Sequence, residues 1–241
     1  MSEITKNIDR VEERIATACR RAGRRREDVR LVAVSKTVPP ERIREAYDAG
    51  LRDFGENRVQ ESERKMPALR ELEITWHMIG HLQTNKARSA RALFDWVQSL
   101  DSLRLAERLD RAPQAAADTG SPPKAGSPLP VLIEVNLGGE ASKSGITAEA
   151  APALARSIGA LPNLSLRGLM TVPPVTDDPE AARPYFALLR ELAGAIDSAR
   201  LPNVRMGELS MGMSHDFDVA IEEGATLVRV GSAIFGERPR L

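Results

Sequence analysis

The sequence predicts an α/β fold, a single (β/α)8 TIM barrel with one additional helix at the N-terminus. Three observations carry this prediction. Eight short β-rich runs recur along the chain, and segments with a helical period of 3.6 residues separate them. Strands that alternate with helices form right-handed βαβ units and a parallel sheet. The length of 241 residues is close to the roughly 250 residues that eight such units need.

The first expected element is an amphipathic helix over residues 3–22. Its apolar residues recur at spacings of three and four and therefore share one face; they are Ile4, Ile8, Val11, Ile15, Ala18 and Ala22. The residues after the last predicted strand are too few for a full eighth helix. We therefore expect the N-terminal helix to cover that part of the barrel.

The eight predicted strands are rich in aliphatic and β-branched residues and are bounded by turn residues. They span residues 29–35, 51–54, 75–80, 95–100, 129–137, 164–172, 205–211 and 226–232. The runs between them, such as PERIREAYDAG and PEAARPYFALLRELAGAID, have helical periodicity. A doubly wound open sheet is the structural alternative, but no GxGxxG turn follows the first predicted strand.

A single domain is expected over residues 1–241. The stretch 112–130 is rich in Ala, Pro, Gly and Ser, so we interpret it as a flexible insertion in that domain. A hydrophobic content of 42% excludes a disordered chain, and the apolar runs are too short to cross a bilayer. The charged N-terminus lacks the apolar region of a signal peptide, which predicts a cytoplasmic protein without membrane contact.

Charge and cysteine content argue against several classes of site. The chain has 34 basic and 34 acidic residues, which gives no global reason to expect nucleic-acid binding. Cys19 is the only cysteine, which excludes an internal disulfide and a cysteine-based zinc site. His77 and His81 have i, i+4 spacing, but they fall in a strand that leads into a loop. Because no third ligand is nearby, no metal site is expected.

Lys36 is the first candidate for chemistry, because reactive residues of such barrels collect after the C-terminal ends of strands. The alternation of side chains in a strand puts Lys36 on the same face as Val32 and Val34, toward the barrel mouth. A partly desolvated lysine has a lowered pKa and suits Schiff-base chemistry. The alternative is a lysine whose amine only reaches out into solvent from the strand end.

The runs GELSMGMSHDFDVAIEEG and TLVRVGSAIFG predict a cup for an anion after strands seven and eight. Ser214 stands at the expected N-cap of a helix that begins near His215, and Gly231 and Ser232 follow the last strand. Loops at this place recurrently bind phosphate in this fold. Arg229 interrupts an apolar run, so an inward guanidinium needs a ligand atom or a carboxylate as its partner. Lysine and cup together indicate a phosphorylated aldehyde as the ligand.

Two further mouth positions carry polar side chains. The second strand leads into FGENRVQE, where Asn57 offers both a hydrogen-bond donor and an acceptor. The alternative for Asn57 is a helix cap. The fifth strand closes with EVNLGGEASKSG, which contributes Asn136 and Lys143.

Seven ordered motifs resemble the pyridoxal-phosphate homeostasis protein family. They are VAVSKTVP, FGENRVQE, WHMIGHLQTNK, EVNLGGEASKSG, RGLMTVPP, ELSMGMSHDF and VRVGSAIFG. The resemblance runs from about residue 4 to 238. It implies a barrel similar to the N-terminal domain of alanine racemase, which is the fold of the fold-type III enzymes that depend on pyridoxal 5′-phosphate (PLP).

The resemblance implies that PLP is bound as a covalent aldimine on Lys36. It also implies Asn57 near the ring hydroxyl and Arg229 opposite the pyridine nitrogen. The residues implied around the phosphate are Ser210, Ser214, Gly231 and Ser232, and those implied close to the cofactor are His81 and Met211. The chain departs from the family in Arg58, where an aromatic residue is expected, and in the longer stretch 112–130.

The leading functional hypothesis is a PLP carrier in intracellular vitamin B6 homeostasis, without robust turnover and without catalytic residues. Its expected partners are PLP itself and PLP-dependent apo-enzymes, and a monomer is expected because no long apolar surface segment is evident. The first alternative is an amino-acid racemase, which in the alanine-racemase route needs a β-domain and a tyrosine across a dimer interface. Tyr47 and Tyr185 fall in predicted helices, and we expect no β-domain after the barrel. The second alternative is a sugar-phosphate aldolase that uses the same lysine without PLP.

Overall fold

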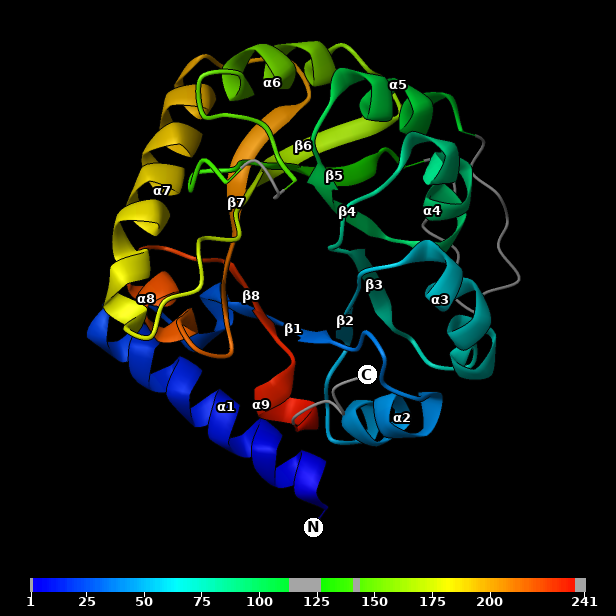
Figure 1. Cartoon of the computed structure of the whole chain (residues 1–241), viewed down its shortest axis with the longest axis vertical. Coiled ribbons are helices and arrows are strands. Elements are labelled where there is room, and N and C mark those ends of the chain that lie inside the picture. Colours follow the sequence, from blue (N-terminus) through cyan, green and yellow to red (C-terminus); the bar gives the residue numbers. More distant parts are fainter. Residues whose placement is uncertain (1, 113–126, 141–143, 237–241) are drawn as a thin grey trace.

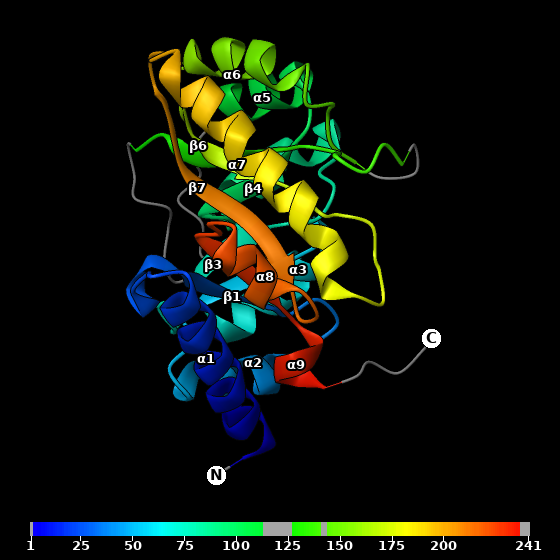
Figure 2. The ribbon, with the colours of Figure 1, turned by 90° about the vertical axis from the view of Figure 1, so that its left-hand side faces the viewer.

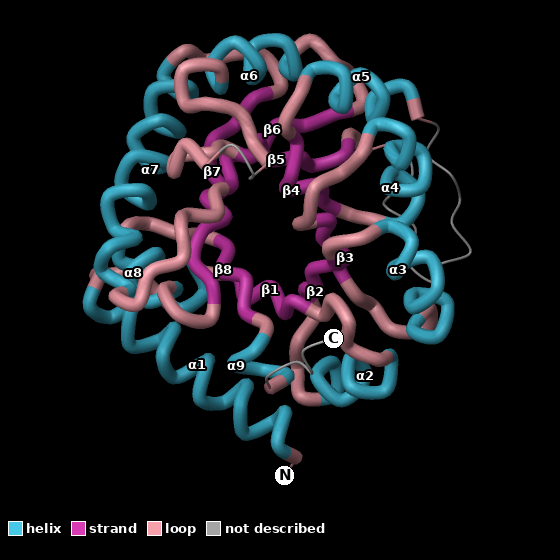
Figure 3. The backbone as a smooth tube through the Cα atoms, viewed as in Figure 1, coloured by secondary structure: helices cyan, strands magenta, loops and turns pink. Residues whose placement is uncertain are grey.

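Eight parallel strands close into a barrel in the computed structural model, which describes residues 2–112, 127–140 and 144–236. Each strand pairs with its successor in the chain, and β1 also pairs with β8 (Figures 1 and 3). The strands are β1 (Arg30–Val34), β2 (Asp53–Glu56), β3 (Thr75–Met78), β4 (Trp96–Leu100), β5 (Leu129–Glu134), β6 (Leu164–Met170), β7 (Val204–Met213) and β8 (Leu227–Val230). The closure confirms the predicted fold class and rules out the open sheet.

A ring of helices surrounds the barrel (Figure 3). They are α1 (Glu3–Arg21), α2 (Pro40–Asp48), α3 (Val59–Lys65), α4 (Ala87–Leu93), α5 (Leu103–Arg111), α6 (Ala151–Gly159), α7 (Arg183–Ser198), α8 (Phe217–Glu222) and α9 (Ser232–Phe235). Short 3₁₀ turns lie at Arg26–Asp28, Met66–Leu69, Thr84–Lys86 and Pro179–Ala182. The apolar faces of the helices pack on the outward side chains of the strands and form the main core.

The N-terminal helix α1 packs on the outer side of α8 and α9, the helices that flank the last strand β8 (Figures 1 and 2). Its start is capped by Ser2, whose hydroxyl accepts the N–H of Thr5. Five residues of the predicted apolar stripe are buried: Ile4, Ile8, Val11, Ile15 and Ala18. The sixth, Ala22, is the C-cap of the helix and is half-buried. Asn7 donates a hydrogen bond of 3.0 Å to the carbonyl of Ile234. As expected, α1 takes the place that an eighth crossover helix would fill.

Most of the predicted insertion at 112–130 falls outside the described residues. Leu129 and Pro130 already belong to β5, so the insertion ends before them. In the described part of the chain, no helix combines the length and the apolar character needed to span a membrane.

Candidate functional site

The predicted lysine and the predicted anion loop leave the barrel from neighbouring strands. β1 and β8 pair in parallel, with Ala33 opposite Val230. Lys36 follows two residues after β1 and is half-buried, and Gly231 directly follows β8. Because parallel strands end on the same side, both segments emerge side by side at the C-terminal mouth of the barrel.

Two backbone amides that follow β8, one at Gly231 and one in α9 at Ala233, face one side chain of the loop after β7. The hydroxyl of Ser214 accepts the N–H of Gly231 at 3.3 Å and the N–H of Ala233 at 3.4 Å. Gly231 is buried and Ser232 is exposed. Backbone N–H groups that converge on one point form a concavity suited to an anionic oxygen. In this structure the hydroxyl of Ser214 accepts both N–H groups, and an anionic oxygen in the place of that hydroxyl would meet the same two donors.

The predicted N-cap role of Ser214 is wrong. Helix α8 begins at Phe217, and its N-cap is Asp216. The carboxylate of Asp216 accepts the N–H of Met213 at 2.6 Å and thereby fixes the turn after β7. Ser and Asp are both favoured at N-caps, so the spacing in this run could not decide between them. The hydroxyl of Ser214 does not cap α8 and accepts instead the N–H groups of Gly231 and Ala233.

Arg229 points into the barrel, where its side chain is only 4% exposed. Its guanidinium donates to the hydroxyl of Ser210 at 2.5 Å and to the carbonyl of Thr171 at 2.8 Å. Burial lowers the pKa of Arg229 to about 10, and the carboxylates of Glu134 and Asp216 oppose that shift. The group stays charged at neutral pH. Among the described residues its direct partners are a hydroxyl and a carbonyl, not a carboxylate.

A chain of hydrogen bonds crosses the barrel interior from Ser210, and the sequence did not reveal it. The hydroxyl of Ser210 donates to Gln98 at 2.6 Å, and the amide nitrogen of Gln98 lies 2.9 Å from Nδ1 of His77. Nε2 of His77 lies 2.8 Å from the carboxylate of Asp53. A Gln98 amide that donates to Nδ1 leaves the ring proton on Nε2, where it is donated to Asp53. The polar residues within apolar strands are the sequence signal that could have revealed this chain.

Glu134 is a second interior residue that sequence reasoning missed. It ends β5 with an exposed fraction of 8%, and its Oε2 atom has no hydrogen-bond partner in the described structure. Burial raises the pKa of Glu134 to about 7, although the charge of Arg229 acts in the opposite direction. At neutral pH this carboxyl group is therefore close to the midpoint of its titration.

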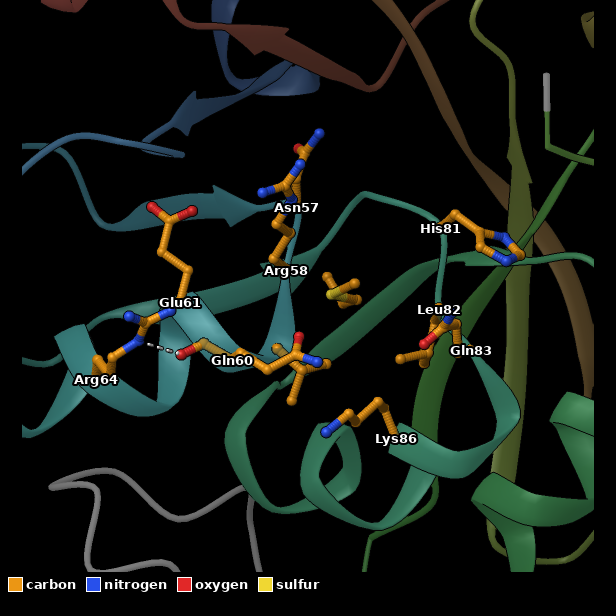
Figure 4. Close-up of a pocket in the computed structure, with 11 residues that line it drawn as sticks. Asn57, Arg58, Gln60, Glu61, Arg64, His81, Leu82, Gln83 and Lys86 are labelled. Carbon is orange, nitrogen blue, oxygen red and sulfur yellow. Dashed lines mark hydrogen bonds between the residues drawn. The ribbon is translucent and has the colours of Figure 1, made fainter. Parts of the chain in front are cut away.

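Asn57 and His81 line a cavity of about 460 Å³ at the rim, between the loops after β2 and β3 (Figure 4). The other lining residues are Arg58, Val59, Gln60, Glu61, Arg64, Met78, Leu82, Gln83 and Lys86. The N-cap of α3 is Arg58, so Asn57 is not a helix cap. Nδ1 of His81 lies 3.1 Å from the carboxylate of Asp101.

A close backbone approach keeps Asn57 in place. A Cβ atom at Gly80 would lie 2.4 Å from the carbonyl oxygen of Asn57 and 2.7 Å from its Cα. Only glycine allows the loop after β3 to pack this closely against Asn57.

The side chain of Met211 does not join the interior residues. It is fully buried in the main core, whereas its neighbour Ser210 contacts Arg229 inside the barrel. Successive side chains of a strand point to opposite faces, which explains the separation. Lys143 lies outside the described residues.

Comparisons with known proteins agree with this geometry. The family model for the alanine racemase N-terminal domain matches residues 7–239. The pyridoxal phosphate homeostasis protein of Aquifex aeolicus is 48% identical over 231 residues, which cover 96% of each chain. The protein of the same name from Pseudomonas aeruginosa is 48% identical over 99% of this chain and 97% of its own.

Solved structures give the same result. PipY of Synechococcus elongatus with PLP bound has a TM-score of 0.81 and 36% identity, over 97% of this chain and 100% of its own. Alanine racemase from Corynebacterium glutamicum has a TM-score of 0.64 and 15% identity, over 96% of this chain and 61% of its own, which is a likeness of fold. The chain belongs to the pyridoxal phosphate homeostasis protein family, whose barrel is that of the alanine racemase N-terminal domain.

Proposed function

We propose that this protein binds PLP as a Schiff base on Lys36 and serves in PLP homeostasis as a carrier without robust turnover. The observation that carries the proposal is the parallel pairing of β1 and β8. It puts the loop of Lys36 beside the two amides that converge on Ser214. The names of the relatives and the PLP-bound state of PipY support the same ligand.

Each predicted site residue has a role in this proposal. The Lys36 amine forms a C=N bond to the aldehyde carbon of PLP, and the aldehyde oxygen leaves as water with the two amine protons. The phosphate is held at Ser214, Gly231 and Ser232, and the guanidinium of Arg229 faces the pyridine nitrogen. Asn57 and His81 lie at the rim toward the ring substituents. Ser210, which the resemblance implies at the phosphate, is proposed instead to orient Arg229, because its hydroxyl contacts Arg229 and Gln98. Met211 is proposed to take part only through its backbone, because its side chain lies in the main core.

The site is tested by reconstitution of the protein with PLP. The visible absorbance of a lysine imine is expected, and borohydride reduction followed by peptide mapping should find the pyridoxyl group on Lys36. The Lys36→Ala variant should lose both signals. A label on Lys86 or Lys143 would overturn the assignment. A protein that stays colourless and that borohydride links covalently to a ketose phosphate, by reduction of their imine, would favour the aldolase.

The absence of robust turnover is the second part of the proposal. General acid–base catalysis by a positioned group contributes about 10²–10⁴-fold to a rate. Tyr47 lies on α2 and Tyr185 on α7, so neither tyrosine stands at a strand end where a racemase needs its second acid or base. A screen of amino acids for racemisation, transamination and decarboxylation should show only the weak intrinsic chemistry of PLP. Lys36-dependent turnover at ordinary enzyme rates would contradict the proposal.

The carrier role is proposed for a cytoplasmic monomer that donates PLP to apo-enzymes. It can be tested by mixing the PLP-loaded protein with a PLP-dependent apo-enzyme in the presence of a scavenger for free PLP. If the transfer is direct, the apo-enzyme should still be activated in the presence of the scavenger. Activation that the scavenger abolishes would show that PLP passes through solution.

A further inference from the structure

Lys65, near the end of α3, is a lysine that the proposed function does not use. It is only 7% exposed and lies next to Glu56, which is fully buried at the end of β2. A buried lysine has to be paired or neutral, because an isolated charge is strongly disfavoured in the interior. The contacts of Lys65 decide between these two states.

The amine of Lys65 has three acceptors. It donates to the carbonyl of Ser35 at 2.8 Å, to Oε1 of Glu56 at 2.9 Å and to Oε1 of Glu61 at 2.8 Å. Three acceptors match the three protons of an ammonium group. Lys65 is therefore held in the charged form and has no lone pair for attack on an aldehyde, which separates its role from that of Lys36.

These contacts fix the backbone on both sides of Lys36. The carbonyl bound by Lys65 belongs to Ser35, the residue directly before Lys36. The N–H of Thr37, the residue directly after Lys36, donates to the same Oε1 atom of Glu61 at 2.5 Å. The hydroxyl of Ser35 also donates to Glu56 at 2.6 Å. One charge cluster, formed by the buried Lys65 and Glu56 and the half-buried Glu61, thus holds the turn that carries Lys36.

The turn needs such a clamp because its backbone is strained. Thr37 has a φ angle of 63°, in the left-handed region that β-branched residues rarely adopt. Strained conformations of this kind persist when the surrounding structure holds them, and they occur at functional sites. The cluster of Lys65, Glu56 and Glu61 supplies the hydrogen bonds that hold this one.

We infer that Lys65 is a positioning residue, whose ammonium group fixes the Ser35–Thr37 turn and thereby sets the amine of Lys36 for Schiff-base formation. The inference rests on the proposed function, since it concerns the bond that Lys36 forms with PLP. The inference predicts different effects on imine formation and on binding of the ring and phosphate, whereas a general structural role would affect both. Imine formation depends on Lys65, whereas binding of the ring and phosphate does not.

The experiment compares Glu56→Gln with the double variant Lys65→Met/Glu56→Gln. Removal of the buried carboxylate in both proteins prevents the uncompensated charge that Lys65→Met alone would leave. The rate constant for imine formation is measured from the visible absorbance after the apo-protein is mixed with PLP. Pyridoxine 5′-phosphate, which has no aldehyde, reports binding without imine formation. Lys6→Met, at an exposed lysine of α1, is the matched control and should behave as the wild type.

The double variant should form the imine about 10- to 100-fold more slowly than Glu56→Gln, because a displacement of about 1 Å at a reacting group has effects of this size. Its affinity for pyridoxine 5′-phosphate should not change. Equal rates of imine formation would overturn the inference. A parallel loss of pyridoxine 5′-phosphate binding would overturn it as well, because it would indicate a structural role for the whole mouth.

Glu61→Ala is the second arm if the double variant does not fold. It removes the acceptor of the Thr37 N–H and leaves Lys65 bound to Ser35 and Glu56. Slower imine formation with unchanged pyridoxine 5′-phosphate binding supports the inference, and an unchanged rate overturns it. If the wild type itself forms no imine on Lys36, the proposed function fails and the inference with it. A labelled Lys36 with unchanged rates in the variants refutes the inference alone.

Discussion

The guanidinium of Arg229 donates a hydrogen bond of 2.5 Å to the hydroxyl of Ser210, and both side chains are buried inside a closed barrel. The hydroxyl of Ser210 in turn donates a hydrogen bond to the amide oxygen of Gln98, which fixes the orientation of the Ser210 hydroxyl that Arg229 contacts. If PLP binds as proposed, a cation held in this way beside the pyridine nitrogen would disfavour protonation of that nitrogen. An unprotonated ring is a weaker electron sink, which would restrain carbanion chemistry on a bound amino acid without forbidding catalysis.

Arg229→Gln should weaken PLP retention and shift the visible spectrum of the bound cofactor, while the fold persists. Loss of a hydrogen bond from a charged group corresponds to about 1.5–3 kcal/mol, or roughly 10- to 100-fold in affinity. A PLP titration followed by absorbance measures both effects, and circular dichroism checks the fold. Unchanged affinity and an unchanged spectrum in the folded variant would leave Arg229 with a purely structural role.

Gln98→Leu should destabilise the barrel. The substitution leaves the Ser210 hydroxyl and Nδ1 of His77 without their buried partner, and an unsatisfied buried group is unfavourable by about 1–3 kcal/mol. Urea unfolding of the apo-protein measures the change. Ser210→Ala removes the other side of the contact, so the double variant should lose less stability than the sum of the two single variants. Strict additivity would show that the two residues do not act as one network.

The elements of the fold were predictable from the sequence because they depend on local patterns. Strand alternation and the apolar stripe of α1 depend only on neighbouring residues, and they located all eight strands and the first helix. The start of α8 was misplaced because Ser214 and Asp216 are both good caps and only the folded loop distinguishes them.

The interior of the site was less predictable, because its contacts join residues far apart in the sequence. Lys36 and Arg229 could be singled out as charges at the end of, or inside, apolar runs. The partnership of Gln98 with Ser210 spans 112 positions, and the clamp of Lys65 on Ser35 spans 30. No local pattern encodes such pairs, and they arise only when the barrel closes.

Glu134→Gln should change how stability depends on pH. The pKa of Glu134 rises from 4.5 to about 7 on folding, so the folded protein retains a proton that the unfolded chain loses. The contribution of Glu134 to stability is therefore complete below pH 4.5 and is lost as the pH rises through 7. Relative to the wild type, the glutamine variant should gain stability between pH 5 and pH 8, by up to about 3 kcal/mol.

Urea unfolding of both apo-proteins at pH 5 and pH 8 measures this gain. Glu13→Gln, at an exposed position of α1, controls for the loss of one carboxylate. A stability difference between Glu134→Gln and the wild type that is the same at both pH values would contradict the assignment of a raised pKa to Glu134.

Gly80→Ala should weaken the binding of PLP through a displacement of Asn57. The added Cβ would lie 2.4 Å from the carbonyl oxygen of Asn57, and the obstacle is backbone on both sides, so the loops after β2 and β3 must separate. Overpacking of this kind is unfavourable by about 1–3 kcal/mol.

Gly194 offers the matched control, because it lies on the exposed face of α7 and its Cβ would meet no atom within 4 Å. Gly194→Ala should stabilise the protein by about 0.5–1 kcal/mol through its helix propensity and leave the PLP affinity unchanged. Urea unfolding should show that Gly80→Ala lowers the stability and that Gly194→Ala raises it. PLP titration should show a loss of affinity in Gly80→Ala alone. Equal PLP affinity in both variants would mean that the position of Asn57 does not matter for the cofactor.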